Sequence, residues 1–198
     1  MGLDQRIVRV ANSNLEKFYI IGHDAIIAPD NPHLDHDYIR DKGAIYRDLE
    51  QSYSKALEDN DPEAEVYRKR MDELLAPYDE TNVWFGRKEN HIHQWVIDFH
   101  NTEAAKAHQW IIDAPRITET NTEYILIDPD ELLGDLYTVI KNPELAPEIM
   151  PTSSGFFFGS TDYDKFYFED VMALHKTLNT EKKQGYFNNH SFFYWSWW

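Results

Sequence analysis

The C-terminal end of the chain constrains the fold more than any other segment, because residues 192–198 read FFYWSWW. More than half of the Phe, Tyr and Trp residues of the chain lie from Phe156 onward, and aromatic residues favour strands. A strand this apolar would promote aggregation if it lay at an exposed sheet edge. Residues 186–198 are therefore predicted to form a terminal strand that is either central in its sheet or buried in a homo-oligomer interface.

The rest of the hydrophobic pattern predicts an α+β fold. Runs of β-branched and aromatic residues predict short strands, at residues 4–11, 18–21, 82–86 and 122–127. Apolar residues spaced by three and four predict helices, at residues 87–99, 128–141 and 162–180. Asp128 can cap the second of these helices, with Pro129 at its first position. We expect a small, mainly antiparallel sheet covered by helices.

Three further features complete this secondary-structure prediction. Helix 162–180 can be capped by Thr161 or Asp162. One apolar side of this helix is expected to hold Phe166, Tyr167, Val171, Leu174 and Leu178. Residues 22–37 are predicted to form a polar loop, and residues 103–112 to extend helix 87–99 or to form a second helix.

A helical hairpin is predicted within a single domain that spans residues 1–198. Residues 41–58 and 63–76 have helical spacing, and the sequence DNDP joins them. Asp61 can cap the second helix and Pro62 suits its first position. The hairpin is expected to project from the main body as an excursion at about residues 41–77.

Charge and composition exclude several classes of function. The 198 residues include 35 acidic and 19 basic ones, for a net charge of −16, and no cysteine. Disulfides, thiolate metal sites and cysteine nucleophiles are thus excluded, and direct nucleic-acid binding is disfavoured because phosphates are held by Lys and Arg. There is no apolar run long enough to span a membrane and no signal-peptide pattern at the start, so we expect a cytoplasmic protein without membrane contact.

The first candidate site is the sequence GRKENHIHQW at residues 86–95. If a helix begins here, its first free N–H groups together with Arg87 and Lys88 can bind an anion. The alternative is that both cations form ion pairs with some of the many carboxylates of the chain.

The second candidate site is the sequence PTSSGFFFGSTDYD at residues 151–164. Gly155 and Gly159 bracket three phenylalanines, and hydroxyl side chains flank them, so this loop can offer aromatic faces and hydrogen-bond donors together. The alternative is a buried strand followed by a capped helix. The spacing fits neither a P-loop nor a dinucleotide fingerprint.

Histidines are numerous, but their spacing does not predict a metal site. His91 and His93 would point in different directions on a helix, and no HExxH pattern occurs. Polar loop histidines are the simpler interpretation of His23, His33 and His36. No cofactor is expected. Nucleophilic catalysis has no signature either, because Gly-x-Ser-x-Gly is absent, and a pair such as Asp162 and Asp164 is unspecific in so acidic a chain.

Two motifs and the first residues, MGLD, resemble a family of small, uncharacterised phage and prophage proteins. The segments RKENHIHQWVIDF and PTSSGFFFGSTDYDKFYFED are similar to that family's patterns RKxNxIHxWFV and PTxSGFFFGSTDYDxxYxED. The matched segments cover about a quarter of the chain, and the family also has an aromatic C-terminal strand. The resemblance implies a phage or prophage setting, and the cytoplasm of the host cell as the location, but it brings no catalytic assignment.

Three functions are compatible with these features. The first is a small-ligand binder that sequesters a nucleotide-like signalling molecule of a host defence system. The second is an acidic inhibitor of a nucleic-acid-binding host defence protein, because residues 128–170 hold ten acids against two lysines. The third, a metal-assisted enzyme acting on a phosphorylated small molecule, is the least favoured. The predicted ligand-binding residues are Arg87, Lys88, Asn90, His93, Trp95, Ser154, Gly155, Phe157, Gly159, Ser160, Thr161, Asp162 and Tyr163.

Overall fold

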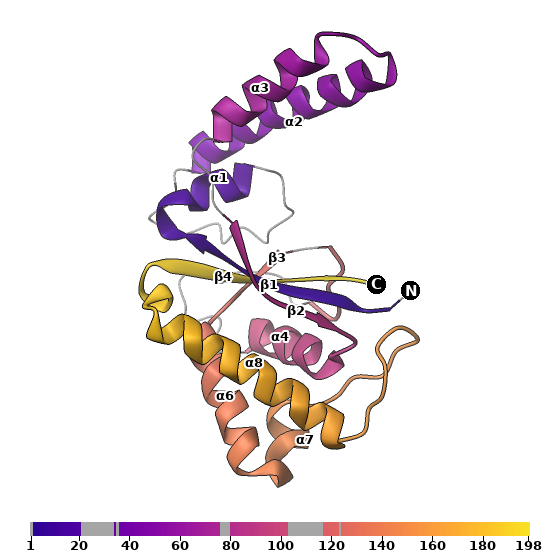
Figure 1. The fold of residues 1–198 in the computed structure, drawn as a ribbon, viewed down its shortest axis with the longest axis vertical. Coiled ribbons are helices and arrows are strands. Elements are labelled where there is room, and N and C mark those ends of the chain that lie inside the picture. The colour runs from indigo at the N-terminus through magenta and orange to yellow at the C-terminus, as the bar shows by residue number, and fades with distance from the viewer. Residues whose placement is uncertain (1, 21–33, 35, 76–79, 103–116, 123) are drawn as a thin grey trace.

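The computed structural model describes residues 2–20, 34, 36–75, 80–102, 117–122 and 124–198. Within them the fold is α+β, with a four-stranded sheet of order β2-β1-β4-β3 (Figure 1). β1 (Asp4–Ala11) pairs with β2 (Glu80–Arg87) and with β4 (His190–Trp197), and β4 pairs with β3 (Tyr124–Ile127). All three pairings are antiparallel. The aromatic C-terminal strand is therefore central, which is one of the two arrangements predicted for it.

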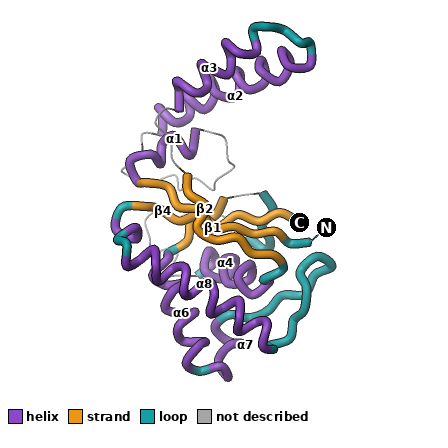
Figure 2. The backbone as a smooth tube through the Cα atoms, viewed as in Figure 1, coloured by secondary structure: helices purple, strands orange, loops and turns teal. Residues whose placement is uncertain are grey.

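Both faces of the sheet are covered, which explains why β4 is apolar at consecutive positions (Figure 2). Phe192 and Tyr194 pack on one face with the helices α4 (Asn90–Asn101), α6 (Pro129–Lys141) and α8 (Lys165–Lys183). Phe193 packs on the opposite face, in a smaller cluster that includes Val8 and Phe18. Side chains alternate between faces along a strand, so a strand that is covered on both faces has apolar side chains at neighbouring positions.

The prediction of a strand at residues 18–21 is wrong. A 3-10 turn, η1 (Asn12–Asn14), leads into the helix α1 (Leu15–Ile20), and Ile21 lies outside the described residues. Leu15, Phe18 and Tyr19 are all buried, which is the i, i+3, i+4 spacing of one helix face. Phe18 stacks on Phe193 with ring centroids 4.4 Å apart, so this short helix covers the second face of the sheet.

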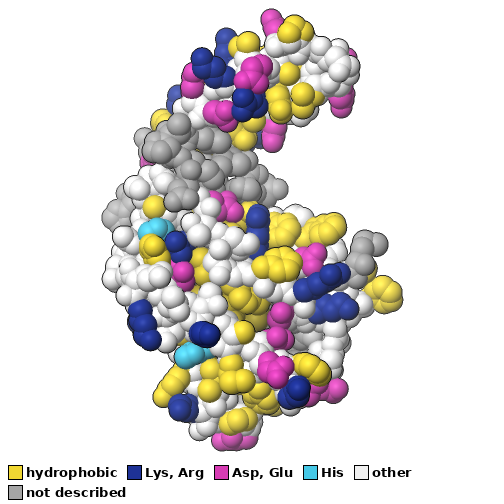
Figure 3. All heavy atoms as spheres, in the orientation of Figure 1, with side chains coloured by type: hydrophobic (Ala, Val, Ile, Leu, Met, Phe, Trp, Pro, Cys, Tyr) yellow, Lys and Arg dark blue, Asp and Glu magenta, His cyan; other side chains and the backbone are white. Residues whose placement is uncertain are grey.

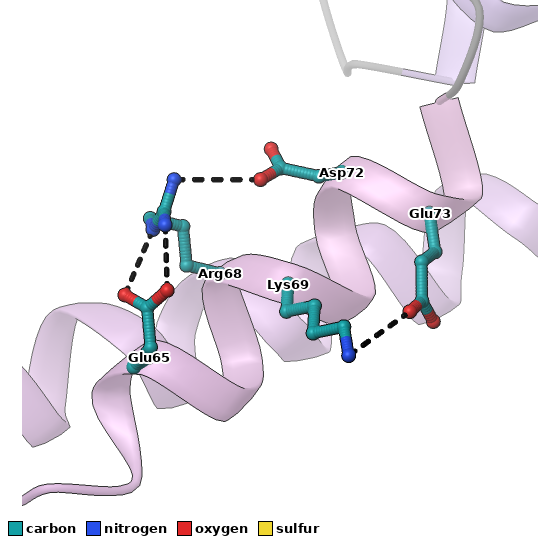
Figure 4. Close-up of polar contacts among 5 residues, drawn as sticks. All are labelled: Glu65, Arg68, Lys69, Asp72 and Glu73. Atoms are coloured by element: carbon teal, nitrogen blue, oxygen red, sulfur yellow. Dashed lines mark hydrogen bonds and ion pairs between the residues drawn. The ribbon is translucent and has the colours of Figure 1, made fainter.

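The predicted helical hairpin is confirmed and projects from the main body (Figure 1). It consists of α2 (His36–Glu58), which begins five residues earlier than expected, and α3 (Ala64–Leu75). At the turn, the Asp61 carboxylate accepts a hydrogen bond from the Glu63 backbone N–H. Arg68 bridges Glu65 and Asp72 along α3, and Lys69 pairs with Glu73 (Figure 4). Such exposed pairs each contribute only a few tenths of a kcal/mol.

The start of α6 agrees with the prediction, whereas the start of α8 does not. The Asp128 carboxylate accepts hydrogen bonds from the N–H groups of Asp130 and Glu131, with Pro129 at the first position. α8 is capped by Asp164 rather than by Thr161 or Asp162. The Asp164 carboxylate accepts hydrogen bonds from the backbone N–H groups of Phe166 and Tyr167.

The buried face of α8 is predicted correctly at four of five positions. Tyr167, Val171, Leu174 and Leu178 are buried, but Phe166 is 64% exposed. Since α8 begins only at Lys165, Phe166 lies in its first turn, where it points away from the core.

Two short turns and a short helix connect the larger elements. They are η2 (Pro143–Leu145), α7 (Ala146–Ile149) and η3 (Tyr186–Asn188). Most of the predicted loop 22–37 and all of segment 103–112 lie outside the described residues. Among the helices that are described, none has the length and apolar character needed to cross a bilayer.

Candidate functional site

Asn90 joins the two sequence motifs in space. Its side-chain Nδ2 donates to the carbonyl oxygens of Phe158 (2.9 Å) and Ser160 (2.7 Å), and its Oδ1 accepts from the Ser153 N–H (3.1 Å). Asn90 is the first residue of α4, whereas its partners belong to residues 151–164, here called the phenylalanine loop. The two stretches singled out in the sequence therefore do converge, through a buried carboxamide that uses three of its hydrogen-bonding positions.

The phenylalanine loop is also tied to the start of β1. The Leu3 N–H donates to the Phe157 carbonyl (3.1 Å), and the Lys88 N–H donates to the Leu3 carbonyl (2.7 Å). Gly159 has a φ of +87°, and a Cβ there would lie 3.1 Å from the Lys88 Cβ. Only glycine fits this combination of positive φ and close approach without strain.

A pocket of about 420 Å³ lies between the phenylalanine loop, α4 and the C-terminal residue. This volume is typical of small-molecule sites. Trp198 closes one side, with its indole N–H donating to the Thr120 carbonyl. The described lining residues are His93, Gln94, Ile97, Thr118, Glu119, Ser153, Ser154, Gly155, Phe156, Phe157, Phe158 and Trp198.

Aromatic rings form much of the pocket wall. The Phe158 ring lies 5.7 Å from that of Trp198 in an edge-to-face arrangement, and 5.1 Å from the imidazole of His93. The Phe157 ring lies 6.3 Å from that of Trp198. At the mouth, Phe156 is 96% exposed, although its side chain is large and apolar. An exposed aromatic side chain beside a pocket is available to stack on a planar ligand.

A buried polar network lies behind the pocket. His93 is 1% exposed, and its Nδ1 is 2.9 Å from the hydroxyl of the fully buried Tyr194. Gln5 Nε2 donates to the same hydroxyl (2.9 Å) and to the Glu89 carbonyl (3.0 Å), while Gln5 Oε1 accepts from the Glu89 N–H (3.0 Å). Burial lowers the pKa of His93 to about 4 and raises that of Tyr194, so both are neutral at pH 7.

Two polar atoms of the lining residues lack a partner. His93 Nε2 and Ser153 Oγ are both buried, and neither has a hydrogen bond to any residue that the structure describes. Buried polar groups are almost always hydrogen-bonded, because leaving one unpaired costs roughly 1–3 kcal/mol. Two unpaired groups at one pocket are available to hydrogen-bond to a molecule that enters it, whether that molecule is water or a ligand.

Arg87 and Lys88 do not contribute to this pocket. Arg87 ends β2 and Lys88 follows it, and α4 begins at Asn90 and not at residue 87 as predicted. Arg87 Nε lies 3.4 Å from Asp4 Oδ1, and its side chain is 61% exposed. For Arg87 the structure thus shows the ion pair that was considered as the alternative to an anion site.

The residue that directly precedes α4 is acidic. Glu89 precedes the helix, and one of its carboxylate oxygens is buried against Gly86. Burial, with a smaller contribution from the nearby Asp170 carboxylate, raises the pKa of Glu89 to about 7. A second anion would be repelled here whenever Glu89 is ionised.

Several other predicted residues shape the site without lining the pocket. Trp95 is in the core, where its indole N–H donates to Asp135 (2.8 Å) and its ring stacks on Phe99. The Tyr163 hydroxyl accepts from the Thr152 N–H (3.1 Å). The Ser160 hydroxyl accepts from the Asp162 N–H, and the Thr161 carbonyl accepts from the Thr152 hydroxyl. These contacts fix the conformation of the phenylalanine loop.

The predicted residues that do line the pocket are His93, Ser154, Gly155 and Phe157. Sequence reasoning missed Gln94 and Ile97, which share one face of α4 with His93 at i, i+1 and i+4. It also missed Thr118, Glu119 and Trp198. The aromatic tail was interpreted as a strand that is either central in its sheet or buried in an oligomer interface, and Trp198 was not singled out as a site residue.

The histidines that are described do not gather around a metal position. His91 packs its ring on Tyr167, with centroids 4.4 Å apart, whereas His93 faces Tyr194, so the two point in different directions. Burial lowers the pKa of His91 to about 4. No group of three or more His, Asp and Glu residues that could hold a metal ion occurs in the described part of the chain; His23 and His33 lie outside it.

The acidic segment 128–170 is partly engaged within the fold. Asp128 and Asp164 cap helices, and Asp135 accepts from Trp95. Asp130 pairs with Lys182 and Glu169 with Lys165. On the face drawn in Figure 3, acidic side chains are interspersed with Lys and Arg and form no continuous row.

The pocket combines three chemical features. Aromatic rings form much of its wall, two of its buried polar atoms are unpaired, and one lining residue, Phe156, is an exposed phenylalanine. No family model matches this chain, and neither a curated protein nor a solved structure matches it.

Proposed function

We propose that this chain is a small-ligand-binding protein that holds the planar part of a nucleotide-like molecule in the pocket between α4, the phenylalanine loop and Trp198. The observation that carries the proposal is the pair of unpartnered buried atoms, His93 Nε2 and Ser153 Oγ, among aromatic lining residues. Stacking of one base on aromatic rings contributes about 1–3 kcal/mol, and the two polar atoms would fix its orientation.

Binding without turnover is better supported than catalysis. Ser153 Oγ and His93 Nε2 make no hydrogen bond to each other, so they do not form a nucleophile and base pair. Glu119 supplies the single carboxylate among the described lining residues, and it is exposed to solvent rather than held in place by burial. A ligand that is only held would be released intact.

The two sequence motifs add a setting to this proposal. Their resemblance to phage and prophage proteins suggests capture of a nucleotide-like signalling molecule of a host defence system, in the cytoplasm of the host cell. Sequestration needs a pocket that binds tightly and does not transform its ligand, which is the chemistry argued above.

A thermal-shift experiment tests the proposal. Nucleosides, nucleotides and cyclic nucleotides would each be added to the intact protein. A ligand at a hundred times its Kd should stabilise the fold by about 2.7 kcal/mol. This corresponds to a rise in Tm of roughly 5–10 °C for a chain of this size. Chromatography of the released ligand then distinguishes binding from turnover.

Variants locate the binding site. Trp198→Ala removes one wall of the pocket and should abolish most of the ligand-dependent rise in Tm. The matched control is Phe85→Ala, because Phe85 is an aromatic residue of β2 that is 62% exposed and is not among the lining residues. Flat melting curves across the whole panel, or an equal loss in both variants, would contradict the proposal.

A further inference from the structure

We infer that the pocket selects an uncharged heterocycle that directs a carbonyl oxygen at the Nε2–H of His93, and that it disfavours a phosphate in its interior. This inference rests on the proposed function, because it names the class of ligand for the same pocket. It follows from the buried network that fixes which nitrogen of His93 carries the proton, and from the charges of the lining residues.

The orientation of the Gln5 carboxamide is the first step. The Glu89 backbone N–H can only donate, so the Gln5 atom that faces it must be the oxygen. The Gln5 NH₂ group therefore faces the Glu89 carbonyl and the Tyr194 hydroxyl and donates one hydrogen to each. If the carboxamide were rotated by 180°, its NH₂ group would face the Glu89 N–H, and two donors would oppose each other.

The proton of Tyr194 is the second step. Its hydroxyl oxygen already accepts from Gln5, so its own proton needs an acceptor, and His93 Nδ1 lies 2.9 Å away. The Ser196 hydroxyl is also near Tyr194, but it donates its own proton to the Thr120 carbonyl, and among the described residues His93 Nδ1 is the acceptor that lies at hydrogen-bond distance from the Tyr194 hydroxyl. With Nδ1 as an acceptor, the neutral imidazole of His93 must carry its proton on Nε2.

The unpaired atom of His93 is thus a donor. Nε2–H is buried, has no partner among the described residues and belongs to a ring that lines the pocket. A carbonyl oxygen of a ligand is a matching acceptor. Ser153 Oγ, the second unpaired atom, can donate or accept and so suits either a second carbonyl or a ring N–H.

The charges of the pocket argue against a phosphate inside it. Glu119 is the charged side chain among the described lining residues, and none of these is Lys or Arg. A buried phosphate would lie near this carboxylate without a cation to compensate the loss of its hydration. A phosphate attached to the ligand would have to remain at the exposed mouth, beside Ser154 and Gly155.

Two measurements on the intact protein test the inference. The first is NMR of protein labelled with ¹⁵N in histidine, which reports the tautomer of His93 directly. The proton is expected on Nε2 at pH 7, and a proton on Nδ1 would overturn the inference. In Tyr194→Phe, Nδ1 loses its donor, so the preference for the Nε2–H tautomer should weaken.

The second measurement compares inosine, guanosine and uridine with their 5′-monophosphates by thermal shift and calorimetry. Each nucleoside is expected to bind at least as tightly as its monophosphate, and Ser153→Ala should weaken binding roughly tenfold. Binding of the monophosphates alone would overturn the ligand class and leave the proposed function intact. Absence of binding by every probe would overturn both.

Discussion

Asn90 connects α4 to the phenylalanine loop through three hydrogen bonds from one buried side chain. Asn90→Ala removes all three and leaves two loop carbonyls and one N–H to find other partners. We expect a loss of about 3 kcal/mol in the free energy of unfolding, since each such bond contributes about 1 kcal/mol. Urea denaturation measures this loss.

The exposed Asn82→Ala is the control and should change stability by less than about 0.5 kcal/mol. Equal effects of the two variants would contradict the proposed role of Asn90.

Glu89 predicts an unusual pH dependence. Its pKa is about 7 in the fold and near 4.5 when unfolded, so the fold prefers the protonated form. Its contribution to stability is therefore fully present below about pH 4.5 and is lost as the pH rises through 7. Glu89→Gln imitates the protonated form and should raise Tm at pH 8 but not at pH 4.5.

The comparison of the two proteins at each pH isolates Glu89 from the other titrating groups. His91 and His93 act in the opposite direction, because their lowered pKa values remove stability as the pH falls from 6.5 to 4, but they are common to both proteins. Asp170, whose pKa is also raised by burial, is common to both as well. Glu144→Gln, at an exposed position, is the control. A difference in Tm between Glu89→Gln and wild type that is the same at both pH values would refute the assignment.

At the level of elements, the phenylalanine loop depends on a glycine whose requirement can be tested. Gly159→Ala puts a Cβ at a φ of +87° and 3.1 Å from the Lys88 side chain. We expect it to cost about 1–2 kcal/mol in unfolding free energy and to weaken ligand binding.

Gly134→Ala is a matched control for which the expected change in unfolding free energy has the opposite sign. Gly134 lies inside α6 and nothing is within 4 Å of its would-be Cβ, so alanine should stabilise the protein by about 0.5–1 kcal/mol. Thermal denaturation of both variants measures these two changes in stability. Stabilisation by Gly159→Ala would show that this loop is not held in the conformation described.

Elements with strong local signals were predictable from sequence. The Asp128 and Pro129 start of α6 is a local signal that needs no tertiary information. The apolar run in β4 predicted that this strand is buried, either in the centre of the sheet or in an oligomer interface, and the strand order shows the first of these. By contrast, a short apolar run such as residues 18–21 suits a strand or a helix equally, and packing against Phe193 decides in favour of the helix.

The pocket was only partly predictable, because its lining comes from segments far apart in the sequence. His93 and Phe157 were identified from their motifs, but Thr118 and Trp198 carry no local signal of their own. Arg87 and Lys88 were wrongly predicted to line the site, because their position also depends on residues far away in the sequence. Adjacent cations suggest an anion site, yet β2 continues through Arg87 and places it beside Asp4.

At the scale of the whole molecule, the helical hairpin lies apart from α4 and the phenylalanine loop, which supply most of the residues that line the pocket (Figure 1). The base of the hairpin belongs to the second core cluster through Ile39 and Tyr46, with Met71 and Leu74 packed against it. The outer part of the hairpin, residues 50–70, mainly packs its two helices against each other. Its surface leaves Leu57 and Val66 about half exposed.

Shortening the hairpin should therefore leave the pocket unchanged. Replacing residues 50–70 by a four-residue turn joins the two helices near the point where they already lie side by side, because connections of two to eight residues suit adjacent antiparallel helices. We expect cooperative unfolding of the shortened chain and the same ligand-induced rise in Tm as in the full chain.

Tyr46→Ala, which opens a cavity in the second cluster, should instead lower the free energy of unfolding by about 3 kcal/mol. Loss of cooperative unfolding or of ligand binding in the shortened chain would mean that the outer hairpin is coupled to the sheet, since none of its residues lines the pocket.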